Sequence, residues 1–444
     1  MMNDRNVTRR RFLHGSAAAA AGALAFPLVV PSRAFGANER LNIAAIGCGG
    51  KGEVDTNGVA DQNLIALCDV DEKNAANTFK RFPSARRYQD YRVMLQEAKN
   101  IDAVTVSTPD HHHAPASLRA MRMGKHVYCQ KPLTHTVHEA RLMRETAREM
   151  KVATQMGNQG HSKSETRRLV ELVRHGVLGN VTAVHVWTDR PIWPQGIRRP
   201  AETQPIPPTL AWDLFLGPAP ERPYNSAYTP FNWRGFWDFG TGALGDMACH
   251  CMDLAFFALD LPAPSSVDAR SFGGTDESAP KWSIIHYNFP ASGKQAALTM
   301  TWYDGGRLPP IELVKGQKMV PNGIILVGDK DTLYVPSYWG DGQFLSGAKT
   351  ADFKDVPQNI PRAPGEFDKG HYNEWINACK GGPKAMSNFD YSGPMSETVL
   401  LGNVALRAGQ PIEWDAKELK VTNVPEANRF VMKQYRAGWR LDVA

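Results

Sequence analysis

The sequence has little cysteine, and the few cysteines are scattered. Six occur in 444 residues, with no Cys-x-x-Cys pair and no spacing typical of a zinc site. This distribution offers no framework for a disulfide scaffold or a structural zinc. We therefore expect the cysteines to be small, buried, apolar side chains.

Excess charge and long apolar runs are also scarce. The formal net charge is +6, and residues 1–37 contribute five arginines against one aspartate, a net +4. The remaining charge of about +2 gives no reason to expect a nucleic-acid partner. The apolar run at 17–30, about 14 residues, is too short to span a bilayer comfortably, so no stable membrane span is predicted. The composition is otherwise that of a globular chain of two or three domains.

Residues 1–37 have the pattern of an export signal. Adjacent arginines and Phe-Leu within residues 8–13 precede the apolar run, and small residues follow at 32–37. The arginine pair resembles a twin-arginine signal, which predicts a periplasmic or otherwise exported protein that uses the twin-arginine machinery. An ordinary secretory signal or an uncleaved anchor is the alternative. Because a twin-arginine passenger is exported folded, any cofactor has to be loaded before export.

A predicted strand followed by a glycine-rich turn opens the next region. Residues 41–46 are typical of a short buried strand and run into the Gly-x-Gly-x-x-Gly loop that begins at Gly47. In such a loop the first glycine permits a tight turn, the second lets a pyrophosphate approach, and the third lets helix and strand pack closely. The following helix N-terminus favours phosphate. We therefore predict that Gly47, Gly49, Gly50 and Gly52 bind a dinucleotide.

A second predicted strand, residues 64–68, ends in Asp69. This acid lies about 20 positions after the first glycine, where a carboxylate binds the ribose 2′-hydroxyl of NAD. The next three residues, Val70, Asp71 and Glu72, include no arginine to receive a 2′-phosphate. The sequence therefore favours NAD over NADP.

Two further predicted strand ends carry polar motifs. The strand at 101–107 ends in Ser107-Thr108-Pro109, with three histidines at 111–113, and the strand at 126–129 ends in Gln130-Lys131-Pro132. Alternating strands and helices predict a doubly wound parallel sheet, which binds ligands beyond the carboxyl ends of its strands. Both motifs should therefore lie beside the cofactor. Because neighbouring histidines point in different directions, we predict no metal there.

The rest of the chain is expected to form an α+β domain. The irregular stretch at 190–239 is rich in proline and tryptophan, and a loop this long usually has a function. Its Trp193, Trp233 and Trp237 are interpreted either as sugar platforms or as packing residues. Alternation at 296–302 favours an antiparallel sheet with one free face, through which a homo-oligomer could form. Other predicted strands lie at 181–188, 283–289, 324–327 and 332–335, and helices at 366–379 and 396–407.

Asp246 and His250 follow a glycine-rich helix start. The two residues are four apart and therefore share one face of the helix. A carboxylate beside a histidine can orient the ring as a general base near neutral pH. On spacing alone, a purely structural pair is the competing interpretation.

Together these motifs resemble the Gfo/Idh/MocA family, which is named after glucose–fructose oxidoreductase, inositol dehydrogenase and MocA. The resemblance rests on the Gly47 loop, Asp69, Ser107-Thr108-Pro109 with His113, Lys131-Pro132, and residues 240–250 with Asp253 beyond. It implies a Rossmann domain, a second domain with an open, mostly antiparallel sheet, and catalysis at their junction by Lys131, Asp246 and His250. It also places His113, Gln130 and Arg234 near the cofactor. The family usually has glutamate where this chain has Gln130, which removes a charge beside Lys131.

The predicted organisation is a leader over 1–37, an NAD-binding Rossmann domain over 38–157 and an α+β substrate and oligomerisation domain over 158–444. The expected function is that of an exported NAD-dependent oxidoreductase that acts on a sugar, polyol or derivative and recycles a tightly bound cofactor. One alternative is a redox-neutral NAD-dependent glycosidase or lyase of the same fold. A second alternative is a non-catalytic exported sugar-binding protein.

Overall fold

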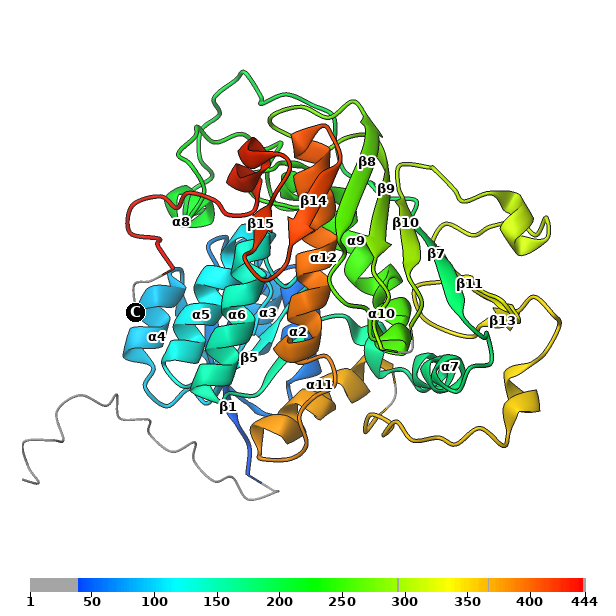
Figure 1. Ribbon diagram of the computed structural model, residues 1–444. Coiled ribbons are helices and arrows are strands. Elements are labelled where there is room, and N and C mark those ends of the chain that lie inside the picture. The colour runs from blue at the N-terminus through cyan, green and yellow to red at the C-terminus, as the bar shows by residue number, and fades with distance from the viewer. Residues whose placement is uncertain (1–38, 294, 366, 442–444) are drawn as a thin grey trace, which may run out of the picture. The chain divides into compact units, whose positions relative to one another are not determined.

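Six parallel strands form the first sheet, in the order β3-β2-β1-β4-β5-β6. Of these, β1 and β5 are labelled in Figure 1. This computed structural model describes residues 39–441 except 294 and 366, so the predicted leader lies outside the described residues. The strand order reverses between β1 and β4, and ligands of doubly wound sheets bind at such a point. The predicted doubly wound sheet is therefore confirmed. Its strands are β1 (Asn42–Ile46), β2 (Asn63–Cys68), β3 (Arg86–Tyr88), β4 (Ala103–Val106), β5 (His126–Cys129) and β6 (Thr154–Met156).

Five helices connect these strands. Both β4 and β5 are buried along their whole length, as expected for parallel strands covered on two faces. The longest of the helices, α6, begins with a capping box in which Thr136 and Glu139 satisfy each other's backbone N–H groups. The helices are α2 (Lys51–Gly58), α3 (Ala76–Arg81), α4 (Tyr91–Glu97), α5 (His113–Arg122) and α6 (Val137–Met150).

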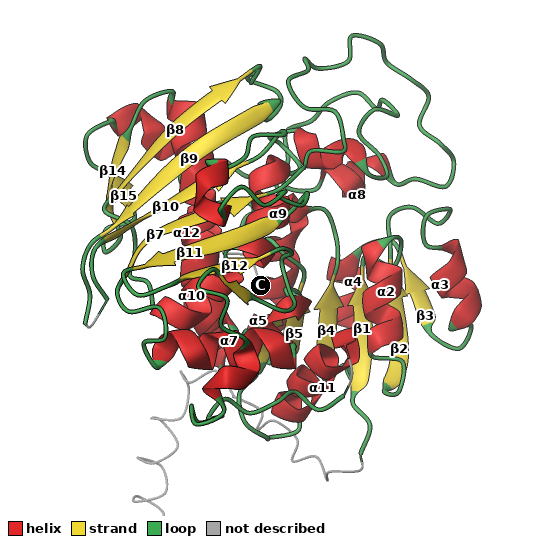
Figure 2. Ribbon diagram, turned by 90° about the vertical axis from the view of Figure 1, so that its right-hand side faces the viewer, coloured by secondary structure: helices red, strands yellow, loops and turns green. Residues whose placement is uncertain are grey.

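The second sheet has nine strands and is mostly antiparallel (Figure 2). Its order is β13-β12-β11-β7-β10-β9-β8-β14-β15, and only the β7–β10 pair is parallel among the paired strands described. The predicted open, mostly antiparallel sheet is confirmed, although four of its strands, β8, β13, β14 and β15, were not predicted. The strands are β7 (Val181–Trp187), β8 (Ser266–Phe272), β9 (Trp282–Phe289), β10 (Leu298–Tyr303), β11 (Gly323–Gly328), β12 (Thr332–Val335), β13 (Gln343–Phe344), β14 (Ile412–Asp415) and β15 (Lys420–Val421).

A long helix, α12 (Phe389–Ala408), joins the two sheets. It packs against α6 on the first sheet and against β8 on the second (Figure 1). The sequence predicted its start only at residue 396, because Pro394 lies inside the helix and proline is disfavoured there. The other helices of this region are α7 (Ser164–Arg174), α8 (Trp212–Leu216), α9 (Gly242–Cys251), α10 (Asp253–Leu259) and α11 (Phe367–Cys379).

Within residues 39–441, apart from 294 and 366, no single helix is long and apolar enough to cross a bilayer. The bent pair α9 and α10 reaches the required length and composition only when its two members are taken together, and most of their residues are buried in the protein.

Two irregular segments lie near the carboxyl ends of the first sheet. Residues 190–239 form an aromatic cluster of their own that includes Trp212, Phe215 and Trp233. The C-terminal chain runs past α8 toward α4 (Figure 1), where Trp439 packs edge-on against Tyr91. Aromatic side chains contribute much of the buried area at such contacts. Both segments thereby come within reach of the predicted cofactor site.

Candidate active site

The glycine loop has the strand–turn–helix geometry that the sequence predicted. Gly47 adopts a φ of 81°, and a Cβ added there would lie 2.5 Å from the carbonyl oxygen of Ser107. A Cβ on Gly52 would lie 2.1 Å from the carbonyl oxygen of Gly47, so only glycine permits this contact. Gly50, with a φ of 54°, precedes α2 and has open space beside it. The exposed helix start fits the pyrophosphate of a dinucleotide.

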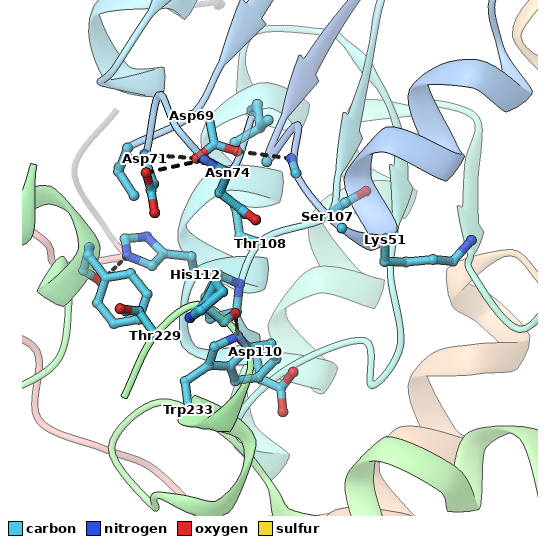
Figure 3. A pocket seen from close by; sticks show the side chains of 18 of the residues that line it. Lys51, Asp69, Asp71, Asn74, Ser107, Thr108, Asp110, His112, Thr229 and Trp233 are labelled. Carbon is cyan, nitrogen blue, oxygen red and sulfur yellow. Dashed lines mark hydrogen bonds between the residues drawn. The ribbon is translucent and has the colours of Figure 1, made fainter. Parts of the chain in front are cut away.

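A cavity of about 420 Å³ lies beside this loop, along the carboxyl ends of the first sheet. Figure 3 shows Lys51, Ser107, Asp110 and Trp233 around it. The structure therefore brings most of the predicted site residues together. Those that line the cavity are Gly47, Gly49, Gly50, Asp69, Ser107, Thr108, Pro109, Gln130, Lys131, Trp233, Arg234 and Asp246.

Asp69 holds the glycine loop from the second strand end. One carboxylate oxygen accepts hydrogen bonds from the backbone N–H groups of Cys48 at 2.7 Å and Gly49 at 3.1 Å. The other oxygen accepts from the N–H of Asp71 at 2.9 Å (Figure 3). Burial raises the pKa of Asp69, while these N–H groups favour its charged form. Its predicted contact with the ribose stays a prediction, and its contact with the loop is an additional role.

Lys131, Asp246 and Arg234 form a charged cluster at the cavity. The Lys131 ammonium donates to the Asp246 carboxylate at 2.9 Å and to the Asp246 backbone carbonyl at 2.8 Å. Arg234 Nε donates to the same carboxylate oxygen at 3.2 Å. Burial alone would raise the pKa of Asp246, but the charges of Lys131 and Arg234 lower it to about 2. The carboxylate is therefore ionised throughout the physiological range.

His250 does not form the predicted hydrogen bond with Asp246. Asp246 and His250 are the only two residues of α9 that are not fully buried, so they share a face as predicted. The carboxylate, however, is taken by the two cations, and buried His250 Nδ1 has no hydrogen-bond partner among the described residues. Burial, and next the Lys131 charge, lower the pKa of His250 to about 3. The ring lies near Tyr338, with centroids 5.5 Å apart, and is not among the residues that line the cavity.

Asp110 is a cavity residue that the sequence did not single out. Its carboxylate accepts from the Thr241 hydroxyl at 2.6 Å and from the Thr241 backbone N–H at 3.0 Å. Burial raises the pKa of Asp110 to about 7, although the Thr241 hydrogen bond opposes the shift. A carboxyl group that titrates near neutral pH inside a cavity is a candidate for proton exchange. Its position directly after the Ser107-Thr108-Pro109 strand end is the sequence signal that could have identified it.

The histidines at 111–113 bind the backbone. His113 Nδ1 lies 2.7 Å from the carbonyl oxygen of Pro132, and Nε2 lies 2.9 Å from that of Thr108, so this ring joins the two strand-end motifs behind the cavity. Rings of His111 and His112 each lie 2.9 Å from the Phe215 carbonyl oxygen. Within the described ranges, no three His, Cys, Asp or Glu side chains are grouped to hold a metal.

The three predicted tryptophans have different positions. Trp233 lines the cavity, and Arg234 packs over its ring at 4.3 Å. Trp193 is buried beside the same guanidinium, 5.9 Å from its ring centre. Trp237 lies outside the cavity and donates to the Thr275 carbonyl at 3.1 Å. The sequence interpretation as a sugar platform therefore applies geometrically to Trp233 alone among the three.

Several cavity residues had no motif to reveal them. Tyr91 and Trp439 line the cavity and pack against His112, and Leu210, Phe215 and Phe231 come from the irregular segment 190–239. Their positions depend on contacts between distant parts of the chain, such as the 3.8 Å approach of the Arg92 guanidinium to the Trp439 ring.

Comparison with known proteins places the chain in a family. Residues 41–158 match the model of an oxidoreductase family with an NAD-binding Rossmann fold, and residues 163–305 match that family's C-terminal α/β domain. The two matches cover more than half of the 444 residues. The chain belongs to the Gfo/Idh/MocA family. The family and the fold that the sequence indicated are thereby confirmed, and its first domain is an NAD-binding Rossmann domain.

Individual relatives are more distant. D-glucoside 3-dehydrogenase of Escherichia coli (strain K12) is 29% identical over 220 residues, 49% of this chain and 53% of that protein. A glycosyl hydrolase family 109 protein of Shewanella pealeana is 31% identical over 176 residues, 36% of this chain and 37% of that protein. The chain thus spans about half the length, or less, of these curated relatives.

A solved structure of similar fold is the WlbA dehydrogenase from Bordetella pertussis, in complex with NADH and UDP-GlcNAcA. It has a TM-score of 0.60 and 18% identity, and the match covers 85% of this chain and 99% of that chain. This likeness shows that the two proteins share a fold.

Proposed function

We propose that this protein is an exported NAD-dependent dehydrogenase that oxidises a hydroxyl group of a sugar, polyol or derivative. One observation carries the proposal: the glycine loop and the Lys131–Asp246 ion pair line the same cavity. Sugar and polyol dehydrogenases among the relatives, including D-glucoside 3-dehydrogenase, support the substrate class. The leader over residues 1–37 supports export.

The residues at the cavity match what such an oxidation requires. When bound, NAD supplies the hydride acceptor. The Lys131 ammonium, held by Asp246 at 2.9 Å, is placed to donate a hydrogen bond to the reacting oxygen and to stabilise its developing negative charge. Arg234 keeps Asp246 ionised and so fixes the ammonium. His250, the proton acceptor that the family resemblance implies, lies outside the cavity lining, and burial lowers its pKa to about 3. Asp110 lines the cavity, and its pKa, which burial raises to about 7, lies in the range where a carboxyl group can take up and pass on the hydroxyl proton.

We further propose that the enzyme retains its cofactor through the reaction cycle. An exported enzyme cannot replenish a cytosolic nucleotide, so the reduced cofactor would be oxidised again in the same site by a second substrate. The position of Trp439 and Phe231 in the cavity lining supports retention, because both come from segments that cover the strand ends from outside the first sheet. Removal of these side chains would open the path for the nucleotide to leave.

A redox-neutral glycosidase or lyase remains the second candidate. It is favoured by the 31% identity to a glycosyl hydrolase family 109 protein. In such a reaction a sugar hydroxyl is oxidised to a carbonyl, and the proton on the adjacent carbon and the leaving group on the carbon beyond it are then eliminated. In the glycosidase, water adds to the resulting double bond. The carbonyl is finally reduced by the hydride that it gave up, so the bound nucleotide would end unchanged. The same Lys131 and Asp246 would serve the oxidation step.

A substrate panel separates these functions. The purified protein is mixed with sugars, polyols and aryl glycosides, while the absorbance of reduced nicotinamide and the release of the aryl alcohol are followed together. The dehydrogenase proposal expects reduction of the bound nucleotide by at least one sugar or polyol, and reoxidation by a second carbonyl compound. Aryl alcohol release with no net reduction would favour the glycosidase. Absence of both reactions, with no nucleotide bound, would favour a sugar-binding protein without catalysis.

A further inference from the structure

A carboxylate buried beneath the glycine loop has no assigned role. Asp55 lies in α2, one turn after Lys51, and its side chain is fully buried. It is not itself part of the cavity lining, yet three of its hydrogen-bond donors, Lys51, Ser107 and Gln130, line the cavity. Buried carboxylates are rare unless they are paired or well hydrogen-bonded.

The Asp55 carboxylate accepts from four side chains on four different segments. One oxygen receives the Lys51 ammonium at 2.8 Å and the Tyr372 hydroxyl of α11 at 2.6 Å. The second oxygen receives the Ser107 hydroxyl at 2.7 Å and the Gln130 amide at 2.9 Å. The glycine loop and the ends of β4 and β5 are thus fixed to a single group. Figure 3 shows Lys51 and Ser107 among the side chains that line the cavity.

The Gln130 amide can be oriented in only one way. Its Nε2 donates to Asp55, and its Oε1 accepts from the backbone N–H of Lys131 at 3.3 Å. A Cβ on Gly157 would lie 2.5 Å from Nε2, so glycine at 157 provides the space that the amide occupies. A connected set of hydrogen bonds therefore runs from Asp55 through Gln130 to the backbone of Lys131, whose ammonium binds Asp246.

Glutamate at position 130 would not fit this environment. An ionised glutamate has no proton to donate to Asp55, and two carboxylates in contact cannot readily both ionise. The one cation that binds Asp55 is Lys51 among the described residues, and the other titratable groups nearby are the phenols of Tyr372 and Tyr128, whose pKa values burial raises. With glutamine at position 130, the positive charge of Lys51 balances the negative charge of Asp55. Glutamate at this position would add a second, unbalanced negative charge below the glycine loop.

We propose that Asp55 is a positioning residue for NAD, and that Gln130 is the amide donor which this carboxylate requires. Asp55 holds Lys51, Ser107 and Gln130 in the arrangement that receives the nucleotide. The inference rests on the proposed use of NAD. It gives a physical reason why this chain has Gln130 after β5, where the family usually has glutamate. A carboxylate on α2 takes the place of the carboxylate that β5 lacks.

A charge exchange tests this assignment without measuring turnover. The dissociation constant of NAD is measured by titration calorimetry on nucleotide-free protein for the wild type, Gln130→Glu, Asp55→Asn and the double variant Asp55→Asn/Gln130→Glu. At pH 8 we expect Gln130→Glu to weaken NAD binding about tenfold or more, because two carboxylates then face each other. The double variant, which restores one amide and one carboxylate, should bind within about threefold of the wild type, and such coupling is the signature of direct contact.

Two further readouts separate positioning from a general loss of structure. As the pH falls toward 5.5, the loss in Gln130→Glu should recover relative to the wild type, since one carboxyl group takes up a proton. Gln62→Glu serves as the matched control. Gln62 is also buried, but it lies outside the cavity, and among the described residues its side chain only accepts a hydrogen bond, from the Leu41 N–H. We expect this control to leave NAD binding unchanged.

The outcomes are distinct. If the wild type binds NAD and Gln130→Glu binds it equally well at pH 8, or if the double variant is no better than the weaker single variant, the role of Asp55 is refuted while the proposed function stands. If the wild type itself binds no NAD, the proposed function fails. Melting temperatures of all nucleotide-free variants identify any protein that has simply not folded.

Discussion

The two walls of the cavity are built in different ways. One wall consists of strand ends and the glycine loop, where each residue's position follows from a short local pattern. The second wall consists of Arg234, Asp246, Phe231 and Trp439, which line the same cavity and come from α9, an irregular segment and the C-terminal chain. The first wall has the geometry that many dinucleotide-binding enzymes share, and it fits the pyrophosphate of NAD. The second holds the groups that would act on a substrate and keep the nucleotide in place, so variants in it should change catalysis and retention rather than the fold.

The largest effect is expected where the two walls meet, at Lys131. Lys131→Met keeps the length of the side chain and removes the charge that faces Asp246. Loss of a donor that stabilises a developing oxyanion costs about 10²- to 10³-fold in kcat. Steady-state rates on the best substrate of the panel should fall by that amount, while the dissociation constant of NAD changes little. Trp237→Phe, outside the cavity, is the control, and a Lys131→Met enzyme of normal rate would contradict the catalytic assignment.

A pH-dependent change in stability is expected at Asp110. Because its pKa rises from 3.8 to about 7 on folding, the native protein favours the protonated form. The free energy of unfolding that this preference contributes is fully present below pH 3.8 and is lost as the pH rises through 7. At 1.4 kcal/mol per pKa unit, it amounts to at most about 4 kcal/mol. Asp110→Asn keeps an acceptor for Thr241 and cannot ionise. Relative to the wild type, its melting temperature should therefore rise between pH 5 and pH 8.

Denaturant unfolding of nucleotide-free wild type and Asp110→Asn at these two pH values measures the effect. The free energies of unfolding should diverge as the pH increases, with the variant the more stable at pH 8. A constant difference between them would show that Asp110 has an ordinary pKa in the folded protein.

A smaller effect, on the rate of NAD dissociation, is expected from a change in the second wall at Trp439. Trp439→Ala removes a buried ring that lines the cavity and packs against Tyr91 and His112. We expect the dissociation rate of NAD to increase about tenfold or more, because most affinity differences among variants of one site lie in this rate. Stopped-flow displacement of NAD by a competing nucleotide measures it. Trp282→Ala on β9, away from the cavity, is the control, because it also removes one tryptophan ring. Equal NAD dissociation rates in the two variants would contradict a role of the C-terminal segment in retaining the nucleotide.

The difference between the two walls also explains which parts of the site the sequence could predict. The glycine loop, Asp69 and the strands around them follow from hydrophobic periodicity and glycine geometry within about 30 residues, and the structure contains them as expected. Lys131 and Asp246 lie 115 residues apart, and only the family resemblance indicated that they act together. The sequence paired Asp246 with His250 from helix spacing and the family resemblance, whereas in the structure the Asp246 carboxylate binds Lys131 and Arg234. The catalytic role of His250 stays a prediction.

Other residues were beyond reach because their properties arise only in the folded protein. Trp439 and Tyr372 reach the site through tertiary packing of the C-terminal part of the chain, which leaves no local pattern. Asp110 acquires its raised pKa from burial. The tryptophan-rich composition of residues 190–239 indicated a functional loop but did not distinguish Trp233, at the cavity, from Trp237, which lies outside it.

Retention of the nucleotide is the central claim, and native mass spectrometry tests it most directly. The protein is purified with no nucleotide added, and its intact mass and absorbance spectrum are recorded before and after extended dialysis. We predict that the native mass exceeds that of the polypeptide by one NAD per chain, and that the excess survives dialysis. A native mass equal to that of the polypeptide alone, with activity that depends on added NAD, would contradict the account.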